Sequence, residues 1–294
     1  MHKTVLSEEV SRLLEAKPGE VIVDCTLGEG GHSEQLLSDT LGRASLVAID
    51  LDKDAMERAR TRLSRFDCRQ YFYSGNFSEI DIALSRAGYE RADKIVVDLG
   101  VSSYQLDHSG RGFTFKNDEP LLMTLSDSPL ETDTTAKDVV NLWSEESLAD
   151  VIYGFGEERS ARKIARAIVS YREKKEIESS LELAEIVRGV VKKSGKIDPA
   201  TRTFQAIRMA VNREVENLEA VLAKGLAVLK KGGRMAVIAF HSIEDRIVKN
   251  FIKNKSETGE VLVLTKKPIT PSEAELVENK RSRSAKLRVF EKAV

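Results

Sequence analysis

Short apolar runs alternate with helical segments over the first hundred residues, and this alternation limits the fold more than any other feature. The runs are rich in β-branched and aromatic residues and have the length of strands; they are Val21–Val23, Leu46–Ile49, Tyr71–Tyr73 and Ile95–Val97. Helical spacing of apolar residues occurs between them, at Ser33–Leu41, Lys53–Phe66 and Phe77–Ala87. Strands that alternate with helices form βαβ units, so we predict a parallel sheet covered by helices on both faces.

The pattern changes in the middle of the chain, where strand signals almost disappear between about residues 104 and 229. Ser179 and Glu182 have the spacing of a capping box, and one long helix is predicted from about Thr201 to Lys231. Strand patterns then return at Met235–Phe240, Val261–Thr265 and Leu287–Phe290. We therefore predict an α/β fold in which an all-helical insertion interrupts a doubly wound sheet. The expected domains are residues 1–103, the insertion 104–205, and 206–294 with a basic tail.

Composition excludes several classes of protein. The chain of 294 residues has a net charge of −1 and no apolar run near the length of about 18 residues that a membrane span needs. Its N-terminus lacks the apolar core of a signal peptide. Two cysteines cannot form a disulfide framework, so a reducing cytoplasm is the expected location. Four scattered histidines argue against a metal site.

Glycines crowd the turn that follows the first predicted strand. The strand ends in Asp24, and positions 28, 30 and 31 are glycine. Glycine lets a backbone approach a ligand where a β-carbon would collide. The second strand ends in Asp50, 22 positions after Gly28, near the spacing of about 20 at which an acid binds a ribose. A nucleoside with a free ribose is therefore the favoured ligand, although glycines that only form a tight turn remain an alternative.

The details of the turn favour one nucleoside cofactor over another. A dinucleotide site has a third glycine three positions after the second, but position 33 is serine. Glu29 would also repel a pyrophosphate. S-adenosylmethionine fits better, because its amino-acid tail can meet the glycine amides and its ribose can meet Asp50. Phe77 follows the third strand and can pack on the adenine, and Asp98 ends the fourth strand where methyl transfer would occur.

Longer motifs run through the whole chain. They are MHKTVL (1–6), GEGGHS (28–33), NF (76–77), DLGVSSYQLDHSGRGFTF (98–115), GEERSARKIARAI (156–168), PATRTFQAIRMAVNRE (199–214), GGRMAVIAFHSIEDRIVK (232–249) and KRSRSAKLR (280–288). In this order they closely resemble the bacterial 16S rRNA cytosine-N4 methyltransferase family, also called MraW.

The resemblance implies a Rossmann-like, seven-stranded methyltransferase sheet with a helical substrate domain. It also implies S-adenosylmethionine-dependent methylation of the exocyclic N4 of one cytidine in 16S rRNA, at the decoding centre of the small ribosomal subunit. The family's cofactor contacts correspond here to Gly30, Gly31, His32, Asp50, Phe77, Asp98 and Gln105. One departure is visible, because Leu122 and Thr124 stand where the family has an acid and a base.

The candidate catalytic residues are Asp98, Ser102 and His241. The amino group of cytosine is a poor nucleophile, so catalysis needs alignment and an acceptor for its hydrogens rather than a strong base. His241 follows a predicted strand, where a hydrogen-bonded structural histidine is an equal alternative. A flipped base would need aromatic or apolar contacts, for which the candidates are Tyr104, Phe113 and Phe115, with core packing as the alternative.

Basic residues gather at three places. A helix over residues 158–172 would place apolar residues on one face and cations on the other, with no acid at the centre of the basic stripe. A phosphate-facing surface is the functional interpretation, and a solvated helix face is the alternative. The candidate RNA-binding residues are Arg159, Arg162, Lys163, Arg166, Arg202, Arg281 and Arg283, and Lys280, Lys286 and Arg288 add charge to the tail.

Three rival functions remain open. A ribosome-assembly protein could keep the sheet and bind RNA without turnover. A nicotinamide-dependent oxidoreductase is disfavoured by the missing third glycine, and DNA cytosine-N4 methylation by the absence of a proline pair after Asp98. The expected partner is 16S rRNA or the small subunit, with no membrane, and the sequence leaves a homodimer open.

Overall fold

The computed structural model describes residues 4–192 and 197–294, so Met1–Lys3 of the first family motif lie outside it. The chain divides into two compact units: unit 1 comprises Met1–Gly100 and Val215–Val294, and unit 2 comprises Val101–Glu214. The second boundary lies nine residues after the expected one at 205/206, which would have cut a helix.

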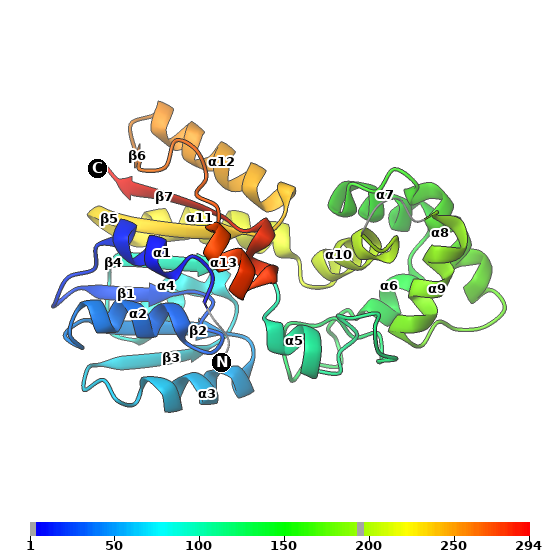
Figure 1. Cartoon of the computed structure of the whole chain (residues 1–294), viewed down its shortest axis with the longest axis horizontal. Coiled ribbons are helices and arrows are strands. Elements are labelled where there is room, and N and C mark those ends of the chain that lie inside the picture. The colour runs from blue at the N-terminus through cyan, green and yellow to red at the C-terminus, as the bar shows by residue number, and fades with distance from the viewer. Residues whose placement is uncertain (1–3, 193–196) are drawn as a thin grey trace. The chain divides into compact units, whose positions relative to one another are not determined.

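Unit 1 contains a seven-stranded sheet (Figure 1). Its strands are β1 (Val21–Asp24), β2 (Ser45–Asp50), β3 (Gln70–Ser74), β4 (Ala92–Asp98), β5 (Leu229–Ala239), β6 (Val261–Val263) and β7 (Lys286–Lys292). They lie in the order β3-β2-β1-β4-β5-β7-β6. The first five are parallel, and β7 is antiparallel to both of its neighbours. All seven predicted strands and the α/β class are confirmed.

Helices cover both faces of this sheet because successive strand residues point to opposite sides. Val21 and Val23 pack in the core under α4 (Ile80–Arg86), α11 (Glu214–Val228) and α12 (Ser242–Glu257). Ile22 packs in the other core, under α1 (Ser7–Leu14), α2 (Gly31–Asp39) and α3 (Lys53–Leu63). Unit 1 also contains the 3-10 turns η1 (Phe77–Glu79) and η2 (Lys280–Ser284), and helix α13 (Glu273–Glu278). No helix in the described part of the chain is long and apolar enough to cross a membrane.

Unit 2 is helical in its described residues and has its own apolar core. Its helices are α5 (Ser103–His108), α6 (Ala136–Leu142), α7 (Glu145–Gly156), α8 (Ala161–Arg172), α9 (Ser180–Val190) and α10 (Ala200–Val211). Ser179 caps α9 by accepting a hydrogen bond from the Glu182 amide. The Glu182 carboxylate accepts from the Glu178 amide instead of the Ser179 amide, so only one half of the predicted capping box forms.

The single long helix predicted from Thr201 to Lys231 is wrong. It is two helices, α10 and α11, which break at Arg213, where φ is 49° in the left-handed region. The Asn212 side chain donates to the Met123 carbonyl at 2.7 Å and accepts from the Leu125 amide at 2.8 Å. This residue therefore supports a distant loop, and periodicity alone could not reveal that requirement. The predicted helix also ended too late, since β5 begins at Leu229.

Candidate functional site

Three neighbouring parallel strands end in carboxylates. Asp24 ends β1, Asp50 ends β2 and Asp98 ends β4, and β1 lies between the other two strands. The carboxyl edge of an open parallel sheet is where ligands bind in such folds. The strand order therefore places the three acids at one edge of the sheet.

The glycines of the turn are needed for two different reasons, backbone conformation and packing. Gly28 and Gly30 have positive φ values of 50° and 77°, which a side chain would strain. A β-carbon on Gly28 would meet nothing within 4 Å, so open space lies beside this backbone. A β-carbon on Gly31 would instead overlap the hydroxyl of Thr4. Gly31 is therefore explained by packing against the N-terminal segment, a cause that the sequence did not reveal.

Asp50 connects the turn to the end of β2. Its Oδ2 accepts a hydrogen bond from the Gly28 amide at 2.7 Å, and its Oδ1 accepts one from the Asp52 amide at 2.9 Å. Each carboxylate oxygen has a second lone pair, so the group can still accept bonds from a ligand. Burial raises the pKa of Asp50 to about 6, although the two amide hydrogen bonds oppose this rise.

Asp24 is buried and explains why position 33 is not glycine. The Ser33 hydroxyl donates to Asp24 Oδ2 at 2.6 Å, and the Thr26 amide donates to Oδ1 at 3.2 Å. Burial raises the pKa of Asp24, while His32 and the Ser33 hydrogen bond lower it. Thr26 also accepts a bond from the Asp98 amide at 2.6 Å. Ser33 therefore binds the Asp24 carboxylate, and Thr26 connects this carboxylate to the backbone of Asp98; the sequence interpretation missed both residues.

The buried His32 side chain lies beside the partly buried carboxylate of Asp98. His32 is 5 % exposed, and its Nε2 lies 3.5 Å from Asp98 Oδ2. Within the described part of the chain, neither ring nitrogen makes a hydrogen bond, and Asp98 Oδ1 has no partner either. Buried polar groups are normally hydrogen-bonded, so these atoms mark a place that a ligand can complete. The donors, acceptors and open backbone at this edge suit a nucleoside cofactor.

Phe77 lies at the start of η1, after β3. Asn76 caps this turn by accepting a bond from the Ser78 amide at 2.9 Å. The Phe77 ring is partly buried against the core of unit 1, which leaves part of it accessible for contact with a planar group. Its contact with an adenine stays a prediction.

Ser102 and Gln105 bind each other at the start of α5 in unit 2. The Ser102 hydroxyl accepts from the Gln105 amide, and the Gln105 carbonyl Oε1 accepts from the Ser102 amide. The Gln105 side-chain nitrogen also donates weakly to the Leu125 carbonyl, at 3.4 Å. This capping box gives both residues a structural role that the sequence interpretation missed. The catalytic role of Ser102 and the cofactor contact of Gln105 stay predictions.

His241 caps α12, which supports the structural alternative. Its Nδ1 accepts from the Glu244 amide at 3.3 Å, while Glu244 Oε2 accepts from the amides of Phe240 and His241. Its Nε2 lies 3.1 Å from Glu244 Oε1 but makes no hydrogen bond to the described residues. The imidazole therefore has one occupied and one unsatisfied nitrogen.

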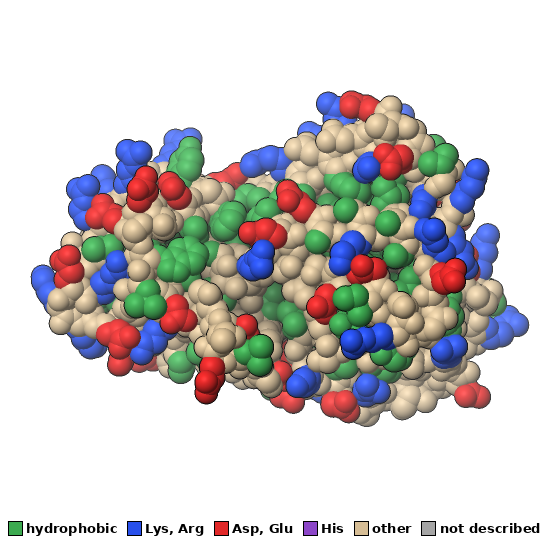
Figure 2. Space-filling model, turned by 180° about the vertical axis from the view of Figure 1, so that it is seen from behind, with side chains coloured by type: hydrophobic (Ala, Val, Ile, Leu, Met, Phe, Trp, Pro, Cys, Tyr) green, Lys and Arg blue, Asp and Glu red, His purple; other side chains and the backbone are tan. Residues whose placement is uncertain are grey.

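The basic helix is amphipathic as predicted. Ala161, Ile164, Ala165 and Ile168 are buried, and the cations Arg159, Arg162, Lys163 and Arg166 are exposed. An acid from another helix nevertheless reaches one end of this stripe, because Glu145 Oε1 of α7 lies 3.5 Å from Arg166 Nε. Acidic and basic side chains are also interspersed on the face drawn in Figure 2.

Other predicted cations have partners within their own units. Arg202 donates to the Glu157 carbonyl at 3.2 Å and lies 3.9 Å from Glu158. In the tail, Lys286 and Arg288 both bind Asp245, at 3.2 and 2.7 Å. Burial raises the pKa of Asp245, but these two hydrogen bonds outweigh it, and the pKa lies below its ordinary value. Arg281 and Arg283 lie in η2 and are exposed.

The aromatic candidates divide between core and surface. Phe113 is buried in the core of unit 2, and the Phe115 ring packs edge-on against Phe204 with centroids 5.0 Å apart. Core packing therefore explains both. The Tyr104 ring is more exposed and lies 5.6 Å from the His108 ring.

The loop that departs from the family pattern is held by residues the sequence did not single out. Arg111 is buried and donates to the carbonyls of Thr124 and Leu125, at 3.0 and 2.8 Å. Thr124 itself is buried and donates to the Ser126 carbonyl at 3.1 Å. The Thr124 side chain thus stabilises the loop through a hydrogen bond within it.

Comparisons with known proteins agree with the sequence resemblance. The model of the MraW methylase family matches residues 1–293. A protein of Coprothermobacter proteolyticus named ribosomal RNA small subunit methyltransferase H is 45% identical over 293 residues, covering 100% of this chain and 96% of that protein. A protein of the same name from Solibacter usitatus is 44% identical over 291 residues, covering 99% of each.

Two solved structures are also similar along nearly the whole chain. An rRNA methylase from Streptococcus thermophilus has a TM-score of 0.46 and 11% identity, over 100% of this chain and 99% of that one. The N-methyltransferase NodS from Bradyrhizobium japonicum has a TM-score of 0.44 and 11% identity, over 98% and 94% of the chains.

We predict that Gly31→Ala destabilises unit 1 even without any ligand, because the new methyl group would overlap the Thr4 hydroxyl. Overpacking of this kind costs about 1–3 kcal/mol. Urea unfolding of the ligand-free protein measures it. Thr4→Gly in the same chain should recover most of the loss, whereas an equal loss in both variants would refute the packing explanation.

Proposed function

The chain belongs to the MraW methylase family, and from this we propose that it methylates the exocyclic N4 of a cytidine in 16S rRNA. The methyl donor is S-adenosylmethionine, and the target lies at the decoding centre of the small subunit. Relatives named ribosomal RNA small subunit methyltransferase H support the rRNA substrate. The observation that carries the proposal is the edge formed by Asp24, Asp50 and Asp98 beside the open backbone at Gly28.

Four parts of this edge would hold the cofactor. Asp50 accepts hydrogen bonds from the ribose hydroxyls, and Phe77 contacts the adenine. The turn at Gly30 and Gly31 presents its backbone to the amino-acid tail, and His32 offers the buried ring nitrogens that lack partners among the described residues. When bound, the cofactor supplies an electrophilic methyl group on a sulfonium. Gln105 is a further contact that the family resemblance implies.

Asp98 is the residue best suited to act on the cytosine amino group. Its Oδ1 is buried and accepts no hydrogen bond from the described residues, so it can accept one from an amino hydrogen. This contact orients the nitrogen and favours its lone pair for attack, and a positioned acceptor is sufficient without a strong base. The proton that the nitrogen then loses passes to the same oxygen. Ser102 and His241 already cap helices. A catalytic role of either side chain would therefore come in addition to this structural role.

The exposed cations would bind the RNA backbone without reading its sequence. Arg159, Arg162 and Lys163 are the most available in unit 2, because Arg166 and Arg202 have acidic neighbours. Arg281 and Arg283 are the exposed candidates of the tail. The protein would act in the cytoplasm, as a monomer or a homodimer.

Methyl transfer can be tested on small subunits from cells that lack this protein. The purified protein and radiolabelled S-adenosylmethionine should label 16S rRNA, and mass spectrometry should find N4-methylcytidine at the decoding centre. RNA binding without any label transfer would favour the assembly protein instead. Label on cytidine C5 or on another rRNA would contradict the proposed atom or substrate.

We predict that cofactor affinity falls as the pH drops below about 6. Burial raises the pKa of Asp50 to about 6, and the ionised carboxylate is the form that accepts both ribose hydroxyls. Affinity is therefore fully present above this pH and is lost as the carboxyl protonates. Calorimetry with S-adenosylhomocysteine between pH 5 and pH 8 measures it.

Asp50→Asn is the matched control, because the amide keeps the shape and does not titrate. It should weaken binding by about 1–3 kcal/mol at pH 7.5 and remove the pH dependence. An unchanged pH profile in this variant would show that another group titrates.

We predict that reversing both Arg162 and Arg166 to Glu raises the KM for small subunits several-fold and leaves cofactor affinity unchanged. The reversal replaces two exposed cations that face the phosphates by anions, so the effect should grow as the salt concentration falls. The matched control reverses Lys174 and Lys192, which are exposed elsewhere in unit 2. Equal KM values for the two double variants would contradict the basic stripe.

A further inference from the structure

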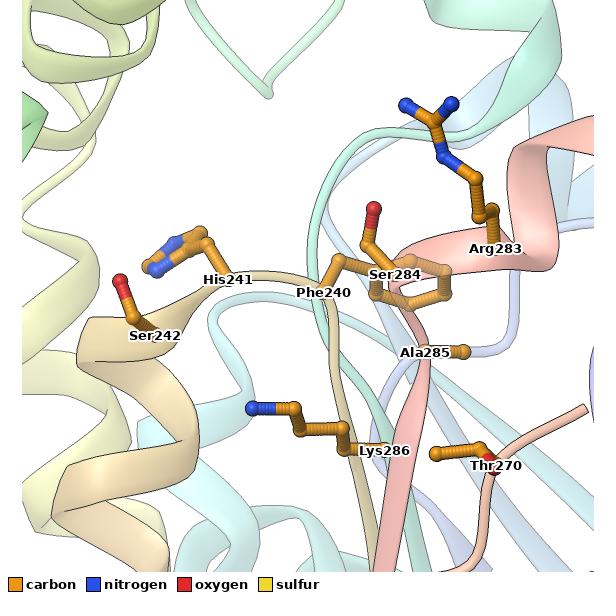
Figure 3. A pocket seen from close by; sticks show the side chains of 8 residues that line it. All are labelled: Phe240, His241, Ser242, Thr270, Arg283, Ser284, Ala285 and Lys286. Atoms are coloured by element: carbon orange, nitrogen blue, oxygen red, sulfur yellow. The ribbon is translucent and has the colours of Figure 1, made fainter.

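A pocket of about 230 Å³ lies in unit 1 at the carboxyl end of β5, outside the cofactor edge. Three chain segments form it: the junction of β5 with α12, the loop between β6 and α13, and the junction of η2 with β7. It is lined by Phe240, His241, Ser242, Thr270, Arg283, Ser284, Ala285 and Lys286. In Figure 3 the Lys286 side chain extends toward the side of His241 and Ser242, while Arg283 stands on the opposite side, beside Ser284.

The pocket has two cations and no carboxylate in its lining. The Arg283 guanidinium is exposed and forms no hydrogen bond or ion pair with the residues that the structure describes. Lys286 Nζ lies 3.2 Å from Asp245 Oδ2, and Arg288 satisfies the other oxygen of this acid at 2.7 Å. An ammonium has three donors, so Lys286 keeps donors for a second anion.

Neutral polar groups complete the lining. Hydroxyl groups of Thr270 and Ser284 can each donate one hydrogen bond. His241 Nε2 is buried, lies 3.1 Å from Glu244 Oε1 and makes no hydrogen bond to the described residues. Two cations and these hydroxyl donors around a small space match the tetrahedral oxygens of a phosphate.

The pocket lies next to the chain segment that carries Asp98, the candidate catalytic residue. Asp98 pairs with Ile238 in the parallel ladder, and the next residue, Leu99, donates to the Ile238 carbonyl at 3.0 Å. A β-carbon on Gly100 would lie 3.7 Å from the Phe240 ring. The chain that carries Asp98 therefore continues directly past Phe240, at the pocket. The glycine turn lies on β1, on the opposite side of β4.

We propose that this pocket binds a backbone phosphate of the RNA strand next to the nucleotide that is methylated. This inference rests on the proposed function, because it assigns a place to one part of that substrate. Arg283 and Lys286 bind the phosphate oxygens, the hydroxyls of Thr270 and Ser284 donate to them, and Phe240 contacts the adjoining sugar. A cytidine whose neighbouring phosphate is held here is directed toward Asp98.

The test compares three single variants for binding and methylation of undermethylated small subunits at several salt concentrations. Arg283→Ala and Lys286→Met each remove one pocket cation. Lys253→Ala removes an exposed cation of α12 that pairs with Glu257, at 3.7 Å, and does not line the pocket. Lys286→Met keeps the length of the side chain, and Arg288 still binds Asp245. Thermal unfolding and S-adenosylhomocysteine titration check that each variant is folded and binds cofactor.

The pocket variants should raise Kd and KM for the small subunit about 10-fold at low salt, with little change in kcat. Each should also reduce the slope of log affinity against log salt by about 1, which is the signature of one lost phosphate contact. Lys253→Ala should change neither quantity. Wild-type slopes in both pocket variants would overturn the phosphate site.

A second comparison separates this inference from the proposed function. If the wild-type protein binds small subunits but transfers no methyl group, the proposed function fails, and the salt slopes still decide the pocket. If transfer occurs and Arg283→Ala and Lys286→Met behave like Lys253→Ala, the proposed function stands and the pocket assignment fails.

Discussion

The crowding of three carboxylates at the ends of adjacent strands is the constraint on which the site depends. Asp24, Asp50 and Asp98 end β1, β2 and β4, and burial raises the pKa of the first two. Charges this close and this buried need hydrogen bonds to remain at the edge. The surrounding turn supplies them to Asp24 and Asp50, from the backbone amides of Thr26, Gly28 and Asp52 and from the Ser33 hydroxyl. An edge of this kind repels a pyrophosphate and favours a cofactor with cationic groups.

The same constraint explains why the glycine turn departs from a dinucleotide fingerprint. Ser33 occupies the position of the third glycine, and its hydroxyl is needed by Asp24. Gly31 is bare because Thr4 lies against it. Ser33 thus serves a carboxylate, Gly31 serves the packing of the N-terminal segment, and the space beside Gly28 remains for a ligand.

The sequence was sufficient for features that depend on local patterns. All seven strands, the acids at their ends and the buried face of α8 follow from periodicity and from the residue at each strand end. The sequence was insufficient where a partner is distant in the chain. The break after Asn212 serves a loop almost ninety residues earlier, and Glu145 reaches Arg166 from another helix.

Helix caps form a second class of residues that motifs alone misplace. Ser102, Gln105 and His241 drew attention as site residues, and each caps the start of a helix in the structure. A cap uses one or two polar atoms and leaves others available, as the unsatisfied Nε2 of His241 illustrates. A structural role and a binding role can therefore share one side chain, and only measurements on ligand binding separate them.

The central claim is that the turn at residues 28–31 and the carboxylate of Asp50 bind a methyl-donating nucleoside. Calorimetric titration of the full chain with S-adenosylmethionine and, separately, with NAD⁺ tests it most directly. The account predicts saturable one-site binding of S-adenosylmethionine and no measurable binding of the anionic dinucleotide. Tight binding of NAD⁺ with no heat from S-adenosylmethionine would contradict it.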